Sequence, residues 1–97
     1  MDMYDLLGIK SPQTQAIELA KRFKMCRKQF KITQKDLASK SGIKYGTIRH
    51  FEQTGQISLT ALLVLADTLN MLKDFELLFN PEKYIDIRKL ANEDNWY

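Results

Sequence analysis

Arg49 and His50 are adjacent, and their side chains can do specific chemistry. A guanidinium fork and an imidazole can both hydrogen-bond to base edges in a DNA major groove. Other small or polar residues of the same stretch share their face at helical spacing, namely Tyr45, Gly46 and Gln53, with Thr47 at the edge. Ile48 and Phe51 would lie on the opposite, inner face. The stretch therefore predicts a helix that reads bases, and the alternative is a polar face that is simply solvated.

Catalysis and metal binding have little support in the sequence. His50 is the single histidine and Cys26 the single cysteine, so they cannot make up a set of ligands at zinc spacing. No glycine-rich loop suited to phosphate is present, and the carboxylates of Asp67 and Asp74 are not an adjacent pair. Cys26 lies on an apolar stripe and is interpreted as a small core residue. We therefore expect no enzyme, no metal and no cofactor.

The base-reading face needs a support, and the stretch from Thr33 to Gln53 predicts two short helices joined by a glycine. Thr33 is a good N-cap for the first helix. Gly42 can end that helix, because glycine adopts the left-handed C-cap conformation without a steric penalty. A second helical pattern begins at Lys44 or Tyr45. Two helices of this length, bent at a glycine, form a helix-turn-helix.

Positive charge is concentrated around this helix pair. The net charge of +3 hides ten lysines and arginines against one acid, Asp36, between residues 21 and 50. Such a block is the expected electrostatic footprint of contacts with DNA phosphates. Lys35, Lys40 and Lys44 are candidates for these contacts. The alternative is a lysine-rich surface that serves only solubility.

The stretch resembles the Cro and lambda-repressor-like (Xre-type) family of helix-turn-helix regulators, through TQKDLA from Thr33, SGI from Ser41 and TIRHFEQTG from Thr47. The resemblance extends less strictly over residues 11–79. It implies an all-α fold, a compact five-helix DNA-binding domain that binds double-stranded DNA as a homodimer. It also implies that Gln34 anchors a phosphate and sometimes a base. Together with the charge pattern, it predicts DNA contacts from Thr33, Gln34, Lys35, Lys44, Tyr45, Gly46, Thr47, Arg49 and His50.

Two positions depart from the family's pattern. Lys44 stands where a serine or threonine usually caps the second helix. Gly46 leaves one base-reading position without a side chain, and it costs about 1 kcal/mol of helix propensity relative to alanine. A glycine there would either let the backbone approach DNA closely or tolerate any base.

A longer helix is predicted before the pair. Ser11 suits its N-cap and Pro12 its first position, because proline there lacks only an amide that would have no partner. The helix is expected to end at Gln29 or Phe30. Its stripe at three-and-four spacing consists of Ala16, Leu19, Ala20, Phe23, Cys26, Arg27 and Phe30.

Arg27 on this apolar stripe needs a partner, because a buried unpaired guanidinium is costly. Glu52 lies one turn after Ile48, on the inner side of the second helix. We therefore predict a structural ion pair between Arg27 and Glu52. The family resemblance supports this pair.

Another apolar helix is predicted to begin after the cap Ser58 and to end at Asn70. Its core stripe would be Leu59, Leu62, Leu63, Ala66 and Leu69. A fifth helix follows over residues 73–79. The apolar side chains left over predict a dimer interface formed by Val64, Leu65, Phe75, Leu78 and Phe79. The alternative is that the termini of the same chain bury them.

Both ends of the chain are interpreted as appendages. Residues 1–10 are an N-terminal extension, either a short helix or an apolar clip onto a neighbour. Residues 80–97 are a C-terminal tail, which either starts a helix at Pro81 or pairs as an edge strand, and Trp96 and Tyr97 are either disordered or a docking point for a second protein.

The sequence shows neither a signal-peptide pattern at its start nor an apolar run long enough to span a membrane. We therefore expect a cytoplasmic protein without membrane contact, acting on a bacterial nucleoid or in a phage-infected host.

The function predicted from these features is a sequence-specific DNA-binding repressor that binds a palindromic operator as a homodimer. The alternative is a HipB-like antitoxin, which would repress its own operon and also bind a cognate toxin. A third possibility is a domain that kept the fold but binds only protein.

Overall fold

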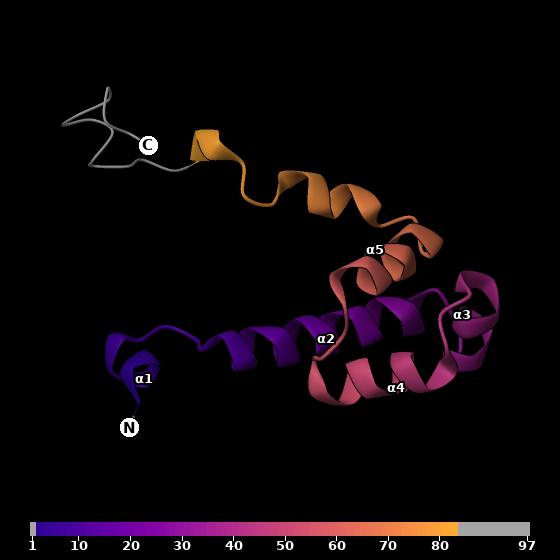
Figure 1. Ribbon diagram of the computed structural model, residues 1–97, viewed down its shortest axis with the longest axis horizontal. Helices are drawn as coiled ribbons and strands as arrows, with labels where there is room; N and C mark the ends of the chain where they lie inside the picture. The colour runs from indigo at the N-terminus through magenta and orange to yellow at the C-terminus, as the bar shows by residue number, and fades with distance from the viewer. Residues whose placement is uncertain (1, 84–97) are drawn as a thin grey trace.

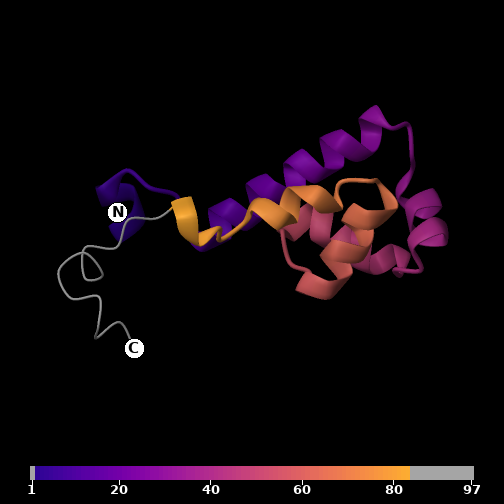
Figure 2. The same ribbon diagram turned by 90° about the horizontal axis from the view of Figure 1, so that it is seen from above.

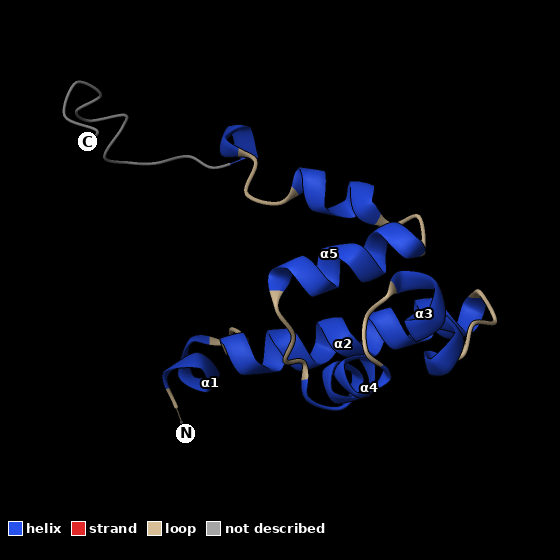
Figure 3. Ribbon diagram, turned by 45° about the vertical axis from the view of Figure 1, so that its right-hand side comes forward, coloured by secondary structure: helices blue, strands red, loops and turns tan. Residues whose placement is uncertain are grey.

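The computed structural model describes residues 2–83, and every regular element in that range is helical (Figure 3). The elements along the chain are α1 (Met3–Leu7), α2 (Pro12–Gln29), α3 (Gln34–Ser41), α4 (Tyr45–Thr54), α5 (Leu59–Thr68) and the 3-10 helices η1 (Leu72–Leu77) and η2 (Pro81–Lys83). The predicted all-α fold is thus confirmed. The predicted fifth helix is present as the 3-10 helix η1.

The two ends of the chain differ in how far the structure describes them. The N-terminal extension contains the short helix α1, one of the two alternatives for that segment. At the other end, η2 begins at Pro81, where Asn80 Oδ1 accepts a hydrogen bond from the amide of Glu82 at 3.1 Å. The rest of the tail, with its helix and strand alternatives and with Trp96 and Tyr97, lies outside the described residues.

Side-chain caps start three of the helices where the sequence predicts them. The hydroxyl oxygens of Ser11, Thr33 and Ser58 each accept a hydrogen bond from the amide three residues further on, at 3.0 to 3.1 Å. These bonds satisfy amides that have no partner within the helix. Gly42 ends α3 with φ +77°, in the left-handed region. Local sequence therefore sets most of the helix boundaries.

The core lies where α2, α3, α4 and α5 meet. Figure 1 shows α4 running alongside α2, with α3 at one end of the pair and α5 above α2. The rings of Phe23 and Phe51 pack edge to face, with centroids 5.5 Å apart. The buried apolar cluster consists of Ala20, Phe23, Leu37, Ile48, Phe51, Leu62, Leu65 and Leu69.

The rotation of α5 differs from the one expected. Its buried residues are Leu62, Leu65 and Ala66, followed by Leu69 at its end, whereas Leu59 is 66% exposed. Placing Leu65 in a dimer interface is therefore wrong, because its side chain is 0% exposed within this chain's own core. An almost wholly apolar helix offers several stripes at three-and-four spacing, so hydrophobicity alone does not fix which one faces inward. Leu63, expected in the core stripe, is only half-buried.

The predicted stripe of α2 is likewise only partly in the core. Ala20, Phe23 and Arg27 are buried, and Cys26 is half-buried. Leu19 and Phe30 are exposed. One side of α2 therefore keeps apolar surface that the described residues do not cover.

Gly55 lets the end of α4 approach the start of α2 closely. Its φ is +79°, and a methyl group there would lie 2.6 Å from the carbonyl carbon of Ala16. Real Cβ atoms do not come so close to a backbone, so both the conformation and the contact require glycine. Gly42 has a similar φ of +77°, but a methyl group there would meet nothing within 4 Å. Both positions therefore require a left-handed backbone conformation, but only Gly55 also requires room for a close helix contact.

We expect Gly42→Ala to lower the free energy of unfolding by about 1–2 kcal/mol, the cost of a left-handed alanine. Gly55→Ala should lower it by a further 1–3 kcal/mol or so, because α4 must also shift away from α2. Urea denaturation of both variants measures the difference. Equal losses would mean that the contact with Ala16 does not constrain the fold.

Candidate nucleic-acid interface

Helix α4 has one face in the core and one in solvent, as the spacing predicts. Ile48, Phe51 and Glu52 are buried. The residues on the outer side are exposed, namely Tyr45, Gly46, Arg49, His50 and Gln53, while Thr47 at the edge is half-buried. The structure therefore brings the predicted base-reading groups together on one accessible helix face.

The N-terminus of α4 is left free of side-chain caps. Lys44 occupies the N-cap position and makes no side-chain capping hydrogen bond. A methyl group on Gly46 would meet nothing within 4 Å, so the backbone in this turn lies beside open space. Uncapped amides at a helix start carry partial positive charge and suit an anion. A phosphate could therefore approach the backbone here.

A bidentate ion pair fixes the inner side of α4 to α2. Nε of Arg27 donates to Oε2 of Glu52 at 2.7 Å, and Nη2 donates to Oε1 at 2.8 Å. The two side chains are 7% and 2% exposed. Nη1 of Arg27 also donates to the carbonyl oxygen of Ile32, at 2.8 Å. The predicted pair is thus present, and its hydrogen bonds offset part of the cost of burying both charges.

Gln34 joins the same network. Its Nε2 donates to Oε1 of Glu52 at 2.9 Å, so one carboxylate holds side chains from both α2 and α3. One N–H group and the carbonyl oxygen of the Gln34 amide remain for other partners. Sequence analysis did not anticipate this bond, because it depends on how closely the start of α3 approaches α4.

His50 has a neighbour that sequence analysis missed. Its Nε2 lies 3.4 Å from Oε1 of Gln56, a contact that suits the tautomer with the proton on Nε2. The loop that carries Gln56 is itself held, because Thr54 Oγ1 donates to the carbonyl oxygen of His50 at 2.7 Å and accepts from the amide of Gln56 at 3.1 Å. Gln56 therefore belongs to the candidate interface, and its position just after the helix was the signal available in the sequence.

The starts of α3 and α4 also meet. Nζ of Lys35 lies 5.8 Å from the centre of the Tyr45 ring, within range of a cation–π interaction. Both residues are exposed, as are the predicted DNA contacts Thr33 and Lys44. This places a cation beside the base-reading face of α4.

No group of three or more histidine, cysteine, aspartate or glutamate side chains that could hold a metal ion occurs within residues 2–83. In the same range, no helix is long and apolar enough to cross a membrane.

Two short helices that meet at a glycine turn, the second with an accessible polar face, define the class of helix-turn-helix domains. A family model described as helix-turn-helix (HTH_3) matches residues 23–75, which is more than half of the chain. The chain therefore belongs to this Cro and lambda-repressor-like (Xre-type) family of DNA-binding transcriptional regulators. No curated protein and no solved structure matches the chain.

We expect Glu52→Ala to lower the free energy of unfolding by about 3–5 kcal/mol, because it leaves the Arg27 guanidinium buried without its partner. The double variant Arg27→Met/Glu52→Met should lose less than Glu52→Ala, since no uncompensated charge remains. Chemical denaturation of the two variants measures these losses.

Glu18→Ala is the matched control for Glu52→Ala. Glu18 pairs with Lys10 at 2.7 Å, and its side chain is 35% exposed, whereas that of Glu52 is 2% exposed. Its removal should leave stability nearly unchanged. If Glu52→Ala melted like the control, the pair would not hold α4 in place.

Proposed function

We propose that the protein represses transcription as a homodimer bound to a palindromic operator, on which it occludes the promoter. The main support for this proposal is the solvent-accessible polar face of α4. The opposite face of that helix is held against α2 by the ion pair of Arg27 and Glu52. Ten basic residues against one acid between residues 21 and 50 favour attraction to a phosphate backbone. Its place of action would be a bacterial nucleoid or a phage-infected host.

Each predicted contact has a role in this proposal. Arg49 reads guanine through a bidentate contact. Neighbouring bases are contacted by Tyr45 and by His50, whose ring lies beside Gln56. Thr47 makes a contact at the edge of the same face. Gly46 lets the start of α4 approach the backbone of the duplex. The contacts with phosphates come from Thr33, Gln34, Lys35 and Lys44.

A palindromic operator requires two recognition helices about 34 Å apart, which a dimer supplies. We place the dimer interface at Val64, Phe75, Leu78 and Phe79, without the buried Leu65. Leu78 and Phe79 are 55% and 83% exposed. In Figures 1 and 3, η1 lies above α5 while α4 lies below α2, so this surface stays clear of the base-reading face.

A HipB-like antitoxin remains the second candidate. The exposed apolar run Leu77–Phe79, which leads into the tail, favours it, because such a surface can bind a protein partner while α4 binds DNA. A pull-down with the full chain that retains a heavier protein encoded by a neighbouring gene would support it. Failure to bind DNA at modest salt would instead support a domain that binds only protein.

The roles of Arg49 and Lys35 can be separated by substitution. Operator fragments are first selected from genomic DNA. Arg49→Ala should cost about 1–3 kcal/mol at the operator and relax discrimination at one base pair, because a base-specific contact is lost. Lys35→Ala should weaken binding to operator and random DNA alike, and should reduce the slope of log affinity against log salt by about 1.

Fluorescence anisotropy across a salt series measures both effects. Equal weakening of all sequences by Arg49→Ala would contradict its assignment as a reader of bases. If the unchanged protein bound no fragment, the repressor proposal itself would fail.

The dimer interface has its own test. We expect Phe79→Glu to shift the dimer toward monomer by at least tenfold in dissociation constant, since a charge would be buried against a second copy. Sedimentation velocity measures the shift. Thr60→Glu, on the exposed start of α5, serves as the control. A dimer unaffected by Phe79→Glu would place the interface elsewhere.

A further inference from the structure

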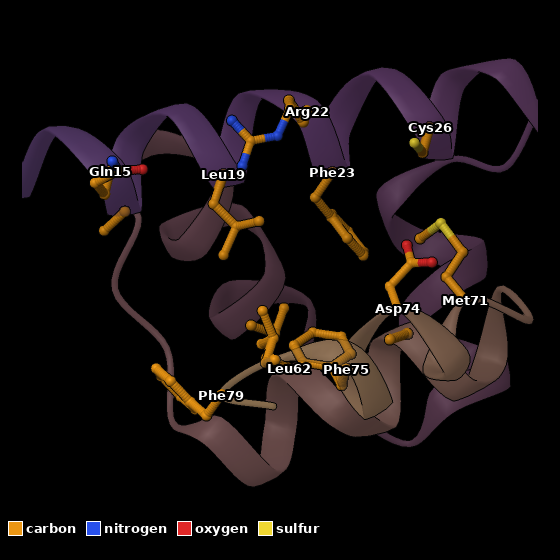
Figure 4. A pocket seen from close by; sticks show the side chains of 13 residues that line it. Gln15, Leu19, Arg22, Phe23, Cys26, Leu62, Met71, Asp74, Phe75 and Phe79 are labelled. Atoms are coloured by element: carbon orange, nitrogen blue, oxygen red, sulfur yellow. The ribbon is translucent and has the colours of Figure 1, made fainter. Parts of the chain in front are cut away.

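An apolar groove of about 540 Å³ separates α2 from η1. Figure 4 shows Leu19 and Phe23 on its α2 side, with Leu62, Phe75 and Phe79 across from them. Arg22 and Asp74 are the charged residues in its lining. Phe79 is 83% exposed and has a positive φ of 55°, which is unusual for a bulky residue. The chain therefore maintains an apolar surface here that its described residues do not cover.

The same chain carries a short apolar helix, α1, that contacts no other helix within residues 2–83. We call residues 2–9 the N-terminal arm. Met3, Leu6 and Leu7 lie on one face of α1 and are 68%, 74% and 62% exposed. Asp2 and Gly8 cap the helix at its two ends. Because a helix of five residues is unstable alone in water, this face needs a surface to pack against.

The arm does not reach the groove of its own chain. In Figures 1 and 2, α1 lies beyond the N-terminal end of α2, and it makes no contact with another helix of the described range. An ion pair between Lys10 Nζ and Glu18 Oε2, at 2.7 Å, holds the linker along α2. The hydrogen bond from Lys10 also keeps the pKa of the Glu18 carboxyl below its ordinary value. The linker therefore directs the arm outward.

Charge favours contact between the arm and α2 of another copy. The arm contains two acidic residues, Asp2 and Asp5, and no basic one. Helix α2, which forms one wall of the groove, carries four exposed basic residues and one acid, besides Arg27, which is buried against Glu52. Opposite charges of this kind attract over a Debye length and orient an encounter.

We infer that the arm of one copy docks its apolar face in the groove of a second copy, and that the exchange is reciprocal. An exposed apolar face and an apolar groove that residues 2–83 leave open can cover each other when two copies meet. This inference rests on the proposed homodimer. It adds that the arm of the second copy covers the apolar surface around Phe79.

The native Cys26 lines the groove and serves as a reporter for the test. We introduce Leu6→Cys in the full chain and oxidise it mildly with oxidised glutathione. A disulfide forms only where the two Cα atoms come within about 7 Å. A covalent dimer on a non-reducing gel, at least tenfold more abundant than in the controls below, is the expected result, with Leu7→Cys as a second variant in case the register differs.

Two controls match the Leu6→Cys variant. Asp5→Cys places the thiol on the opposite face of α1, and Leu6→Cys/Cys26→Ser removes the reporter. Neither substitution touches the core, because every residue of α1 is exposed and Cys26 is only half-buried. Circular dichroism melting checks that all variants stay folded.

Several outcomes would overturn the inference. An oxidised monomer with an internal disulfide would mean that the arm occupies its own groove. A dimer from Leu6→Cys/Cys26→Ser would mean that arms pair with each other. Equal crosslinking by Asp5→Cys, or none by either apolar-face variant, would exclude docking through this face.

A second variant separates this inference from the proposed function. Leu6→Glu in the full chain should raise the dimer dissociation constant at least tenfold and weaken binding to a full palindrome more than to a half-site. If Leu6→Glu stayed dimeric and bound the palindrome as the unchanged chain does, the arm would be excluded while the repressor would stand. If the Leu6→Cys variant crosslinked through its arm but the unchanged chain bound no DNA, the repressor would fail and arm docking would stand.

Discussion

The ion pair between Arg27 and Glu52 joins the core of this protein to its function. Both side chains are almost completely buried, so their charges are tolerable only because the two hydrogen bonds are short and direct. Glu52 lies on the inner face of the same helix that presents Arg49 and His50 to solvent. The rotation of α4 about its axis is therefore set by electrostatics as well as by the packing of Ile48 and Phe51.

The network also links the two helices of the motif. Gln34 at the start of α3 donates to the carboxylate that Arg27 holds, and Lys35, its neighbour, lies near the ring of Tyr45 at the start of α4. The two helix starts are thus coupled by one buried and one exposed contact. In the proposed complex, groups aimed at phosphate and groups aimed at bases would keep a constant spacing, since the same carboxylate positions both.

Sequence predicted the features that local chemistry determines. Caps at Ser11, Thr33 and Ser58 and the glycine turn at Gly42 depend on neighbouring residues, so they could be located without coordinates. The face of α4 could be predicted because its apolar and polar residues alternate at a clear helical period. The rotation of α5 could not, since Leu65 and Leu59 are equally apolar and only the packing of the other helices against α5 decides between them. The contact of His50 with Gln56 was also missed, because it depends on the path of the loop after α4, which the local sequence does not determine.

The close approach of Gly55 to Ala16 limits how this domain can adapt. Together with the ion pair at Glu52, it ties the last turn of α4 to α2 at two points, Glu52 and the C-cap Gly55. A helix tied at two points cannot swivel to suit another base sequence. Evolution of a new target would therefore proceed by exchanging side chains on a stationary platform, and any adjustment to the distance between half-sites would have to come from the way two copies assemble.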